Sequence, residues 1–320
     1  MPERKAVDHV TSVREIRRRK TVIQSTAQII RGMKLIATVR LMKDRARAEA
    51  FRPYFEELRG MGAMVLEERE WPEERKGPAG IVAFTSNRGL AGGYSQQIVR
   101  MIAGDGRFLP GTAVVYAVGK RGRDSLAAMG YEIRGDYSEA GERPDGVFAE
   151  KLAGRLLEDY EAGEIGEIYL AYTVFRSAVV QEPRLIRVFP AETEDGRKAE
   201  DGLESENSLG RESGPAAMRE ETVGAGRAGT GEMEYEPDRE QLRERMLPWY
   251  MGGMIYGACL EAAASENGAR MRAMDSAAGN GKKLLEELEL QYNRARQDTI
   301  TRELTEIAAG AGEIMEHEEG

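Results

Sequence analysis

Two stripes of apolar residues with a seven-residue repeat, one near each end of the chain, constrain the fold most strongly. The first stripe contains Ile16, Ile23, Ile30 and Ala37, with Val13, Ala27 and Leu41 close to it. A narrow stripe of this period favours a seam against a partner helix over a broad core-facing surface. We therefore predict one long helix from about Thr11 to Glu70, with an imperfect seam where Lys34 takes an apolar position.

A second helix is predicted from Pro237, which suits a first helical position, to about Met315. Pro248 and the Gly252–Gly253 pair should bend or interrupt it. Further on, apolar positions step by three and four, slip by one residue, and resume: Leu285, Leu288, Tyr292, Ala295, Thr299, then Ile300, Leu304, Ile307, Ala311, Ile314. Two such stripes at opposite ends of one chain suggest an antiparallel intramolecular pair.

Between the stripes the pattern changes to short buried-strand runs alternating with helices. We expect strands over 81–86, 113–118 and 167–175, an antiparallel neighbour over 179–188, and helices over 96–103, 122–129 and 147–160. The predicted fold class is α/β plus a long coiled coil. The antiparallel terminal helices form a rod, and a central open-sheet, Rossmann-like α/β domain lies at its foot.

The expected divisions are 1–75 for the N-terminal helix, 76–193 for the α/β domain and 237–320 for the C-terminal helix. Residues 194–236 are predicted to be a flexible, acidic, glycine-rich insertion. Residues 194–234 contain eight Gly and eleven Asp or Glu, with few large apolar residues. Such a segment buries too little apolar surface to offset the entropy of ordering it.

Charge and composition exclude several classes of protein. The only cysteine is Cys259, and the two histidines, His9 and His317, lie near opposite ends. An intrachain disulfide is therefore impossible, and metal binding or catalysis by Cys or His is disfavoured. No stretch approaches the apolar length of a membrane span. Residues 1–52 hold fourteen Lys or Arg and five acids on a chain of net charge −9, so this basic segment fits either nucleic acid or an acidic protein partner.

The most tempting chemical motif is TSNRGLAGGYS, residues 85–95, between a predicted strand and a predicted helix. It is not G-x-G-x-x-G, and VGKRG at 118–122 lacks the first glycine and the Ser or Thr of a P-loop. Ser86 has no nearby histidine in the sequence and no nucleophile elbow. We therefore expect a structural turn, with nucleotide binding as the alternative, and assign no catalytic, cofactor-binding or metal residue.

Several segments resemble the gamma subunit family of F-type ATP synthases. They are VREIRRRKTVIQSTAQIIRGMKLIATVRLMKDRARAEAFRPY, then SNRGLAGGYS, VGKRGRD, GYEI and FRSAVVQEP, and most specifically ARMRAMDSAAGNGKKLLEELELQYNRARQDTITRELTEIAAGAGEI. The chain departs from the family pattern at Ser25, Ile30, Gly32, Asn87 and Ser95, and in the acidic insertion.

The resemblance implies a non-enzymatic central shaft that couples transmembrane ion flow to ATP synthesis or hydrolysis. Its coiled coil would turn inside a ring of alpha and beta subunits, and its α/β foot would touch the epsilon subunit and the membrane rotor ring. It would bind no nucleic acid, cofactor or small molecule of its own. It would be a peripheral protein on the cytoplasmic face of the bacterial plasma membrane.

The family also implies contacts with the alpha and beta subunits at Met33, Lys34, Arg270, Gln297, Thr301 and Glu303. We expect these side chains to lie off the apolar stripes and to face outward. Two other functions remain open from the residues alone: a nucleotide-dependent α/β enzyme and a basic coiled-coil protein that binds nucleic acid.

Overall fold

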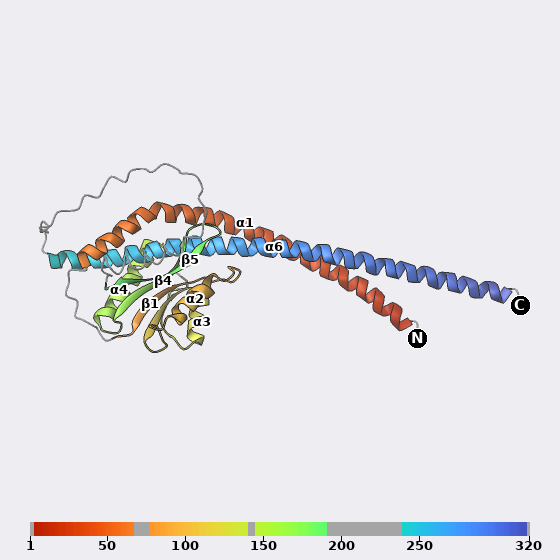
Figure 1. The fold of residues 1–320 in the computed structure, drawn as a ribbon, viewed down its shortest axis with the longest axis horizontal. Helices are drawn as coiled ribbons and strands as arrows, with labels where there is room; N and C mark the ends of the chain where they lie inside the picture. Colours follow the sequence, from red (N-terminus) through yellow and green to blue (C-terminus); the bar gives the residue numbers. More distant parts are fainter. Residues whose placement is uncertain (1–2, 67–76, 140–144, 191–238, 319–320) are drawn as a thin grey trace, which may run out of the picture. The chain divides into compact units, whose positions relative to one another are not determined.

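A computed structural model describes residues 3–66, 77–139, 145–190 and 239–318 of the chain, so the predicted insertion lies outside the described residues. The elements follow in the order α1 (Glu3–Leu66), β1 (Ala79–Phe84), α2 (Tyr94–Gly104), β2 (Ala113–Val118), α3 (Lys120–Ala128), β3 (Glu132–Asp136), α4 (Gly146–Glu161), β4 (Glu167–Phe175), β5 (Gln181–Phe189) and α6 (Arg239–Glu318) (Figure 1). Two long terminal helices flanking an α/β segment confirm the predicted fold class. Among these residues, no helix is both long and apolar enough to cross a membrane.

The chain divides into two compact units. The first contains residues 1–40, 90–92 and 267–320, and therefore the N-terminal part of α1 with the C-terminal part of α6. The second contains residues 41–89 and 93–266, and therefore the sheet, α2 to α4 and the remaining parts of the two long helices.

The second unit is built on one five-stranded sheet of order β3-β2-β1-β4-β5. β3, β2, β1 and β4 run parallel, and β5 returns antiparallel to β4, as predicted. β3 was not predicted. Its sequence, EIRGD, has one large apolar residue, and as an edge strand it is only partly covered, so it carries neither an alternating nor a continuous apolar pattern.

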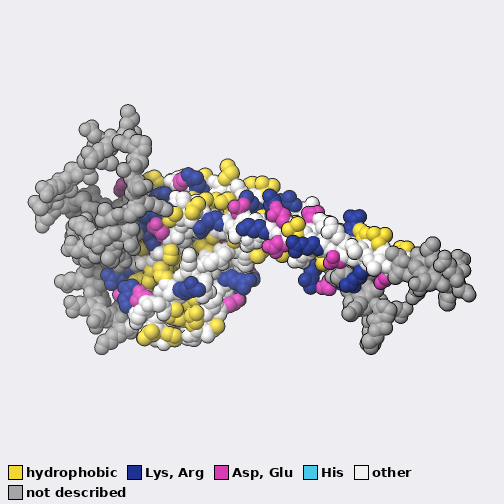
Figure 2. Space-filling model, turned by 45° about the vertical axis from the view of Figure 1, so that its right-hand side comes forward, with side chains coloured by type: hydrophobic (Ala, Val, Ile, Leu, Met, Phe, Trp, Pro, Cys, Tyr) yellow, Lys and Arg dark blue, Asp and Glu magenta, His cyan; other side chains and the backbone are white. Residues whose placement is uncertain are grey.

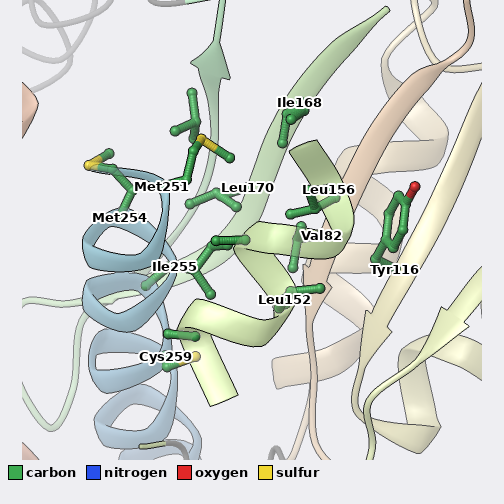
Figure 3. Packing of buried hydrophobic residues seen from close by; sticks show 14 of the residues in the cluster. Val82, Tyr116, Leu152, Leu156, Ile168, Leu170, Met251, Met254, Ile255 and Cys259 are labelled. Carbon is green, nitrogen blue, oxygen red and sulfur yellow. The ribbon is translucent and has the colours of Figure 1, made fainter. Parts of the chain in front are cut away.

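Side chains of β1 alternate between two cores on opposite faces of the sheet, as the pleat of a strand requires. Ile81 and Ala83 face α2 and α3, where they pack with residues such as Ile98 and Leu126. The other face is covered by α4 and by parts of both long helices, whose buried residues include Leu152, Leu156, Met251, Met254, Ile255 and Cys259 (Figure 3).

Two tyrosine hydroxyls of the sheet are paired with carboxylates. Tyr116 donates to Asp159, and both residues are buried. Tyr169 donates to Glu167 across 2.9 Å between the two oxygens. Burial, helped by the bond to Glu167, raises the pKa of Tyr169 to about 12. Burial also raises the pKa of the Cys259 thiol, which makes that cysteine a packing residue of low reactivity.

Pro248 and the Gly252–Gly253 pair are expected to bend or interrupt the C-terminal helix, and of these two outcomes the interruption is wrong, because α6 is continuous through them. Burial of Met251 and Met254, which flank the Gly252–Gly253 pair, supplies the tertiary packing that outweighs poor helix propensity. The glycines of this segment serve a close helix approach instead. A Cβ at Gly253 would lie 2.2 Å from Cδ2 of Leu58 on α1.

Candidate contact surface of the helix pair

In the first unit, α1 and α6 pack along the predicted seam. The covered residues of α1 recur at steps of three and four: Val13, Ile16, Lys20, Ile23, Ala27, Ile30, Lys34 and Ala37. On α6 the predicted stripe is covered in the same way, at Leu285, Leu288, Tyr292, Ala295 and Thr299. This steady alternation is the pattern of a two-helix coiled coil.

Two ion pairs cross this seam and define its direction. Lys20 Nζ lies 3.0 Å from Oε1 of Glu289, and Lys34 Nζ lies 2.5 Å from Oδ1 of Asp275. From Lys20 to Lys34 is fourteen residues along α1, and from Glu289 back to Asp275 is also fourteen residues. The helices are therefore antiparallel and stay in register over two heptads.

The structure corrects the expectation for Lys34, whose side chain reaches across the seam to Asp275 instead of facing outward. The reason is visible in the repeat, because Lys34 occupies a seam position between Ile30 and Ala37. Its neighbour Met33 lies beside the seam and is 39% exposed.

On α6, the predicted contact residues differ in exposure. Gln297, Thr301 and Glu303 are exposed, as expected. Arg270 is half-buried, and its Nη1 donates to Oδ1 of Asn267 across 3.3 Å.

The six predicted residues form two groups that lie at different positions along the helix pair, and we call these positions levels. The register of the two ion pairs places Met33, Lys34 and Arg270 near the same level. Gln297 follows Arg270 by 27 residues on the same helix, which at 1.5 Å per residue is about 40 Å. Any partner that contacts both groups must therefore extend along the helices.

Exposed apolar side chains are the surface feature that the sequence analysis missed. Apart from the seam, the first unit exposes Val22, Ile29, Leu35, Ile36 and Val39 on α1, and Leu284, Leu290, Ile300, Leu304 and Ile307 on α6. In Figure 2, apolar side chains stand at the surface among Lys, Arg, Asp and Glu. Repeated exposure of large apolar residues along a helix marks a protein interaction surface.

The spacing of the sequence contains a signal for part of this surface. Val22, Ile29 and Ile36 each precede a seam residue by one position, so they follow the same seven-residue period on the flank of the seam. At the far end of α6 the predicted seam is wrong. Ile300, Leu304 and Ile307 were expected to continue the seam, but they are 43%, 62% and 69% exposed.

The motif at 85–95, of which residues 85–89 and 93–95 belong to the second unit, is a turn with polar groups that bond to the protein itself. The N–H groups of Gly122 and Lys120 donate to Thr85 Oγ1 and Asn87 Oδ1, each across 3.0 Å. The Ser86 N–H donates to Ser95 Oγ, also across 3.0 Å. A Cβ at Gly119 would lie 2.1 Å from the Thr85 carbonyl oxygen, so this glycine allows the two loops to touch. The N–H groups of Lys120 and Gly122 thus join the turn that follows β1 to the turn that follows β2.

Comparison with known proteins places these features in a family context. A family model described as ATP synthase matches residues 12–313. An ATP synthase gamma chain of Lachnoclostridium phytofermentans is 41% identical over 315 residues, covering 95% of this chain and 100% of that protein. A sodium ion specific ATP synthase gamma chain of Acetobacterium woodii is 33% identical over 311 residues, covering 94% and 98%.

Solved structures share the fold at low sequence identity. The rotor of the Euglena gracilis mitochondrial ATP synthase contains a chain with a TM-score of 0.60 and 17% identity, covering 91% of this chain and 99% of that one. A chain of the OSCP/F1/c-ring structure of the same enzyme gives a TM-score of 0.62 at 17% identity, covering 95% of each.

Proposed function

Because the chain belongs to the ATP synthase gamma chain family, we propose that it is the rotating central stalk of an F-type ATP synthase. Its turning couples ion flow through the membrane to ATP synthesis, or to ATP hydrolysis in the reverse direction. In this role the chain performs no catalysis and binds no nucleotide. The alpha and beta subunits surround its helix pair, and the epsilon subunit and membrane rotor ring contact the α/β domain.

The observation that carries this proposal is the surface of the helix pair in the first unit. A pair of helices with a filled seam needs no further apolar residues for its own packing, yet Ile29 and Ile36 on α1 and Leu304 on α6 are each more than half exposed. Enclosure by a ring of subunits would cover these side chains. The basic character of residues 1–52 would complement acidic groups on such a ring.

The contact residues Met33, Lys34, Arg270, Gln297, Thr301 and Glu303 would act at the two levels of the shaft described above. Exposed ion pairs contribute only about 0–1 kcal/mol each. A shaft shifts a nucleotide site only by the difference in its contact energy with each conformation of that site. Coupling is therefore spread over many polar contacts and over the bulk of the apolar residues.

As part of this complex, the chain would be held at the membrane by its partners. In a bacterium that position is the cytoplasmic face of the plasma membrane. The coupling ion, a proton or sodium, is selected by the membrane subunits.

The test is recovery of the tagged full-length chain from solubilised membranes. The alpha, beta and epsilon subunits should co-purify with it, together with ATP hydrolysis activity. As a control, the tag should be carried by an unrelated peripheral protein from the same membranes. Recovery of the chain without alpha and beta subunits would overturn the proposal.

A further inference from the structure

β4 continues past the strand that pairs with it. Its parallel pairing with β1 ends where Ala83 meets Ala171, whereas β4 itself runs to Phe175. On the β1 side, the Thr173 carbonyl and the backbone N–H and carbonyl of Phe175 therefore have no partner from a strand in the part of the chain that the structure describes. Buried backbone donors and acceptors require partners, so side chains must supply them.

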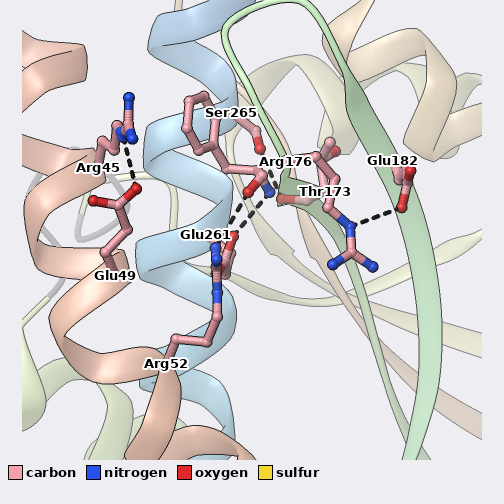
Figure 4. Close-up of polar contacts among 9 residues, drawn as sticks. Arg45, Glu49, Arg52, Thr173, Arg176, Glu182, Glu261 and Ser265 are labelled. Atoms are coloured by element: carbon pink, nitrogen blue, oxygen red, sulfur yellow. Dashed lines mark hydrogen bonds and ion pairs between the residues drawn. The ribbon is translucent and has the colours of Figure 1, made fainter. Parts of the chain in front are cut away.

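Side chains from both long helices form hydrogen bonds with these backbone groups (Figure 4). On α6, Ser265 Oγ donates to the Thr173 carbonyl oxygen across 3.0 Å. Glu261 Oε2 accepts the Phe175 N–H across 2.8 Å. On α1, Arg52 Nη2 donates to the Phe175 carbonyl oxygen across 3.2 Å.

Arg52 and Glu261 are also bonded to each other. Arg52 donates through Nε and Nη2 to Glu261 Oε1, across 3.1 and 2.8 Å. One arginine and one carboxylate thus connect α1, α6 and the end of β4. We call Arg52, Glu261, Ser265 and their backbone partners at Thr173 and Phe175 the three-element joint.

Burial makes this arrangement specific. Glu261 is 7% exposed and Ser265 is fully buried. A buried carboxylate must keep its partners, because an unpaired charge in a dry site is strongly unfavourable. Both oxygens of Glu261 are occupied, one by Arg52 and the other by Phe175 N–H, so the side chain has one favourable geometry.

The joint differs in kind from the apolar core beside it. Contacts of Phe55, Met254 and Ile255 also hold the helices to the sheet, but apolar attraction is non-directional. Charge-assisted hydrogen bonds to a fork-shaped guanidinium depend on orientation as well as distance. The joint therefore adds a resistance to turning and sliding of the helices on the sheet that depends on orientation, beside the resistance of the close-packed apolar core.

We propose that Arg52 and Glu261 are positioning residues that lock the helix pair of the second unit to the sheet, so that the two rotate as one body under load. This inference rests on the proposed function, since only a rotating shaft carries load between these elements. The joint lies at the end of the second unit, where Ser265 is two residues before Asn267, the first α6 residue of the other unit.

The test uses the whole ATP synthase in inverted membrane vesicles. Glu261→Gln keeps the shape of the side chain but replaces one acceptor oxygen with a donor NH₂ group that must face Arg52 or the Phe175 N–H. Arg52→Lys keeps the charge and loses the fork, and its position at the edge of the core makes it the milder change. The matched control is Glu49→Gln, which removes the Arg45–Glu49 pair of 2.7 Å within α1 and connects no second element (Figure 4).

The readout is the number of ions pumped per ATP hydrolysed, measured in the same vesicles. We expect at least a twofold fall in this ratio for Glu261→Gln, a smaller fall for Arg52→Lys, and no change for Glu49→Gln. Fewer assembled complexes with an unchanged ratio would show a purely structural role and overturn the inference. An equal fall for Glu49→Gln would also overturn it. Failure of the wild-type chain to assemble with alpha and beta subunits would instead overturn the proposed function.

Discussion

Lys34 donates a hydrogen bond to Asp275 across the seam of α1 and α6, with 2.5 Å between Nζ and Oδ1. A lysine in an apolar repeat weakens a coiled coil unless its ammonium group is paired with an opposite charge. Here the opposite helix supplies the carboxylate of Asp275. The side chains remain 43% and 66% exposed, so water screens the pair. The pair therefore contributes more to the alignment of α1 with α6 than to the free energy of unfolding.

The first prediction concerns this pair. A double-mutant cycle with Lys34→Ala and Asp275→Ala should give a coupling energy below about 1 kcal/mol, because exposed pairs rarely exceed that value. The cycle is measured by denaturant unfolding of the purified chain, at low and high salt. Coupling above about 2 kcal/mol, or no decrease with salt, would contradict it.

The second prediction concerns the helix crossing at Gly257. A Cβ there would lie 2.1 Å from Cδ2 of Phe55, inside the core, so Gly257→Ala should lower the free energy of unfolding by about 1–3 kcal/mol. The control is Gly279→Ala on the same helix, where no atom lies within 4 Å of the new Cβ. That change should raise stability by about 1 kcal/mol through helix propensity alone. Equal changes in the free energy of unfolding for the two substitutions would contradict the close contact between Gly257 and Phe55.

The third prediction concerns alkaline pH. Unfolded tyrosine loses its proton near pH 10, whereas native Tyr169 has a pKa of about 12. Between these values the native state retains a proton that the unfolded state has released, so the free energy of unfolding falls as pH rises from about 10 to about 12. Below pH 10 the contribution of the Tyr169 hydroxyl to stability is fully present. Each such proton gives a slope of about 1.4 kcal/mol per pH unit. The decrease in the free energy of unfolding from pH 9 to pH 11 should be smaller in Tyr169→Phe than in the unchanged chain. Buried Tyr116 and Cys259, whose pKa values are also raised, account for the decrease that remains. An equal decrease in the two proteins would refute the assignment.

The fourth prediction concerns the exposed apolar flank. Ile36 is 58% exposed, so Ile36→Glu should change the stability of the isolated chain by no more than about 0.5 kcal/mol. The same change should reduce recovery of the alpha and beta subunits, since it would place a charge in the proposed interface. Ile36→Ala is the control for loss of size without added charge. Normal assembly and ATP synthesis in Ile36→Glu would argue against enclosure of this flank.

The fifth prediction concerns a single contact residue. Gln297 is exposed, and one surface contact carries little of a coupling that is spread over the shaft. Gln297→Ala should therefore assemble normally and retain measurable ATP synthesis in vesicles. Abolished synthesis in a fully assembled complex would show that coupling is concentrated at this residue.

The long helices were predictable because their signal is periodic. Seam positions from Val13 to Ala37 follow from spacing alone, and so does the α6 stripe up to Thr299. Buried strands such as β2 were also predictable, because Ala113–Val118 is a continuous apolar run. β3 escaped prediction because an edge strand with polar residues has no such pattern.

The contact surface was less accessible to sequence reasoning. The position of Lys34 in the repeat suggested a defect in the seam, but only the structure supplies its partner, Asp275, 241 residues away. The three-element joint has no local signature either. Arg52, Phe175 and Glu261 are brought together by the ends of strands and the crossing of helices, which no spacing in the sequence records.

The equal fourteen-residue intervals between Lys20 and Lys34 and between Asp275 and Glu289 bear on how such a chain can evolve. Removing one residue from either interval would rotate everything beyond it by about 100° about the helix axis. Length changes in this stretch should therefore arise in compensated pairs, or in whole heptads on both helices at once. Gaps in alignments of related chains should be rare here and concentrate in the connections outside the paired helices.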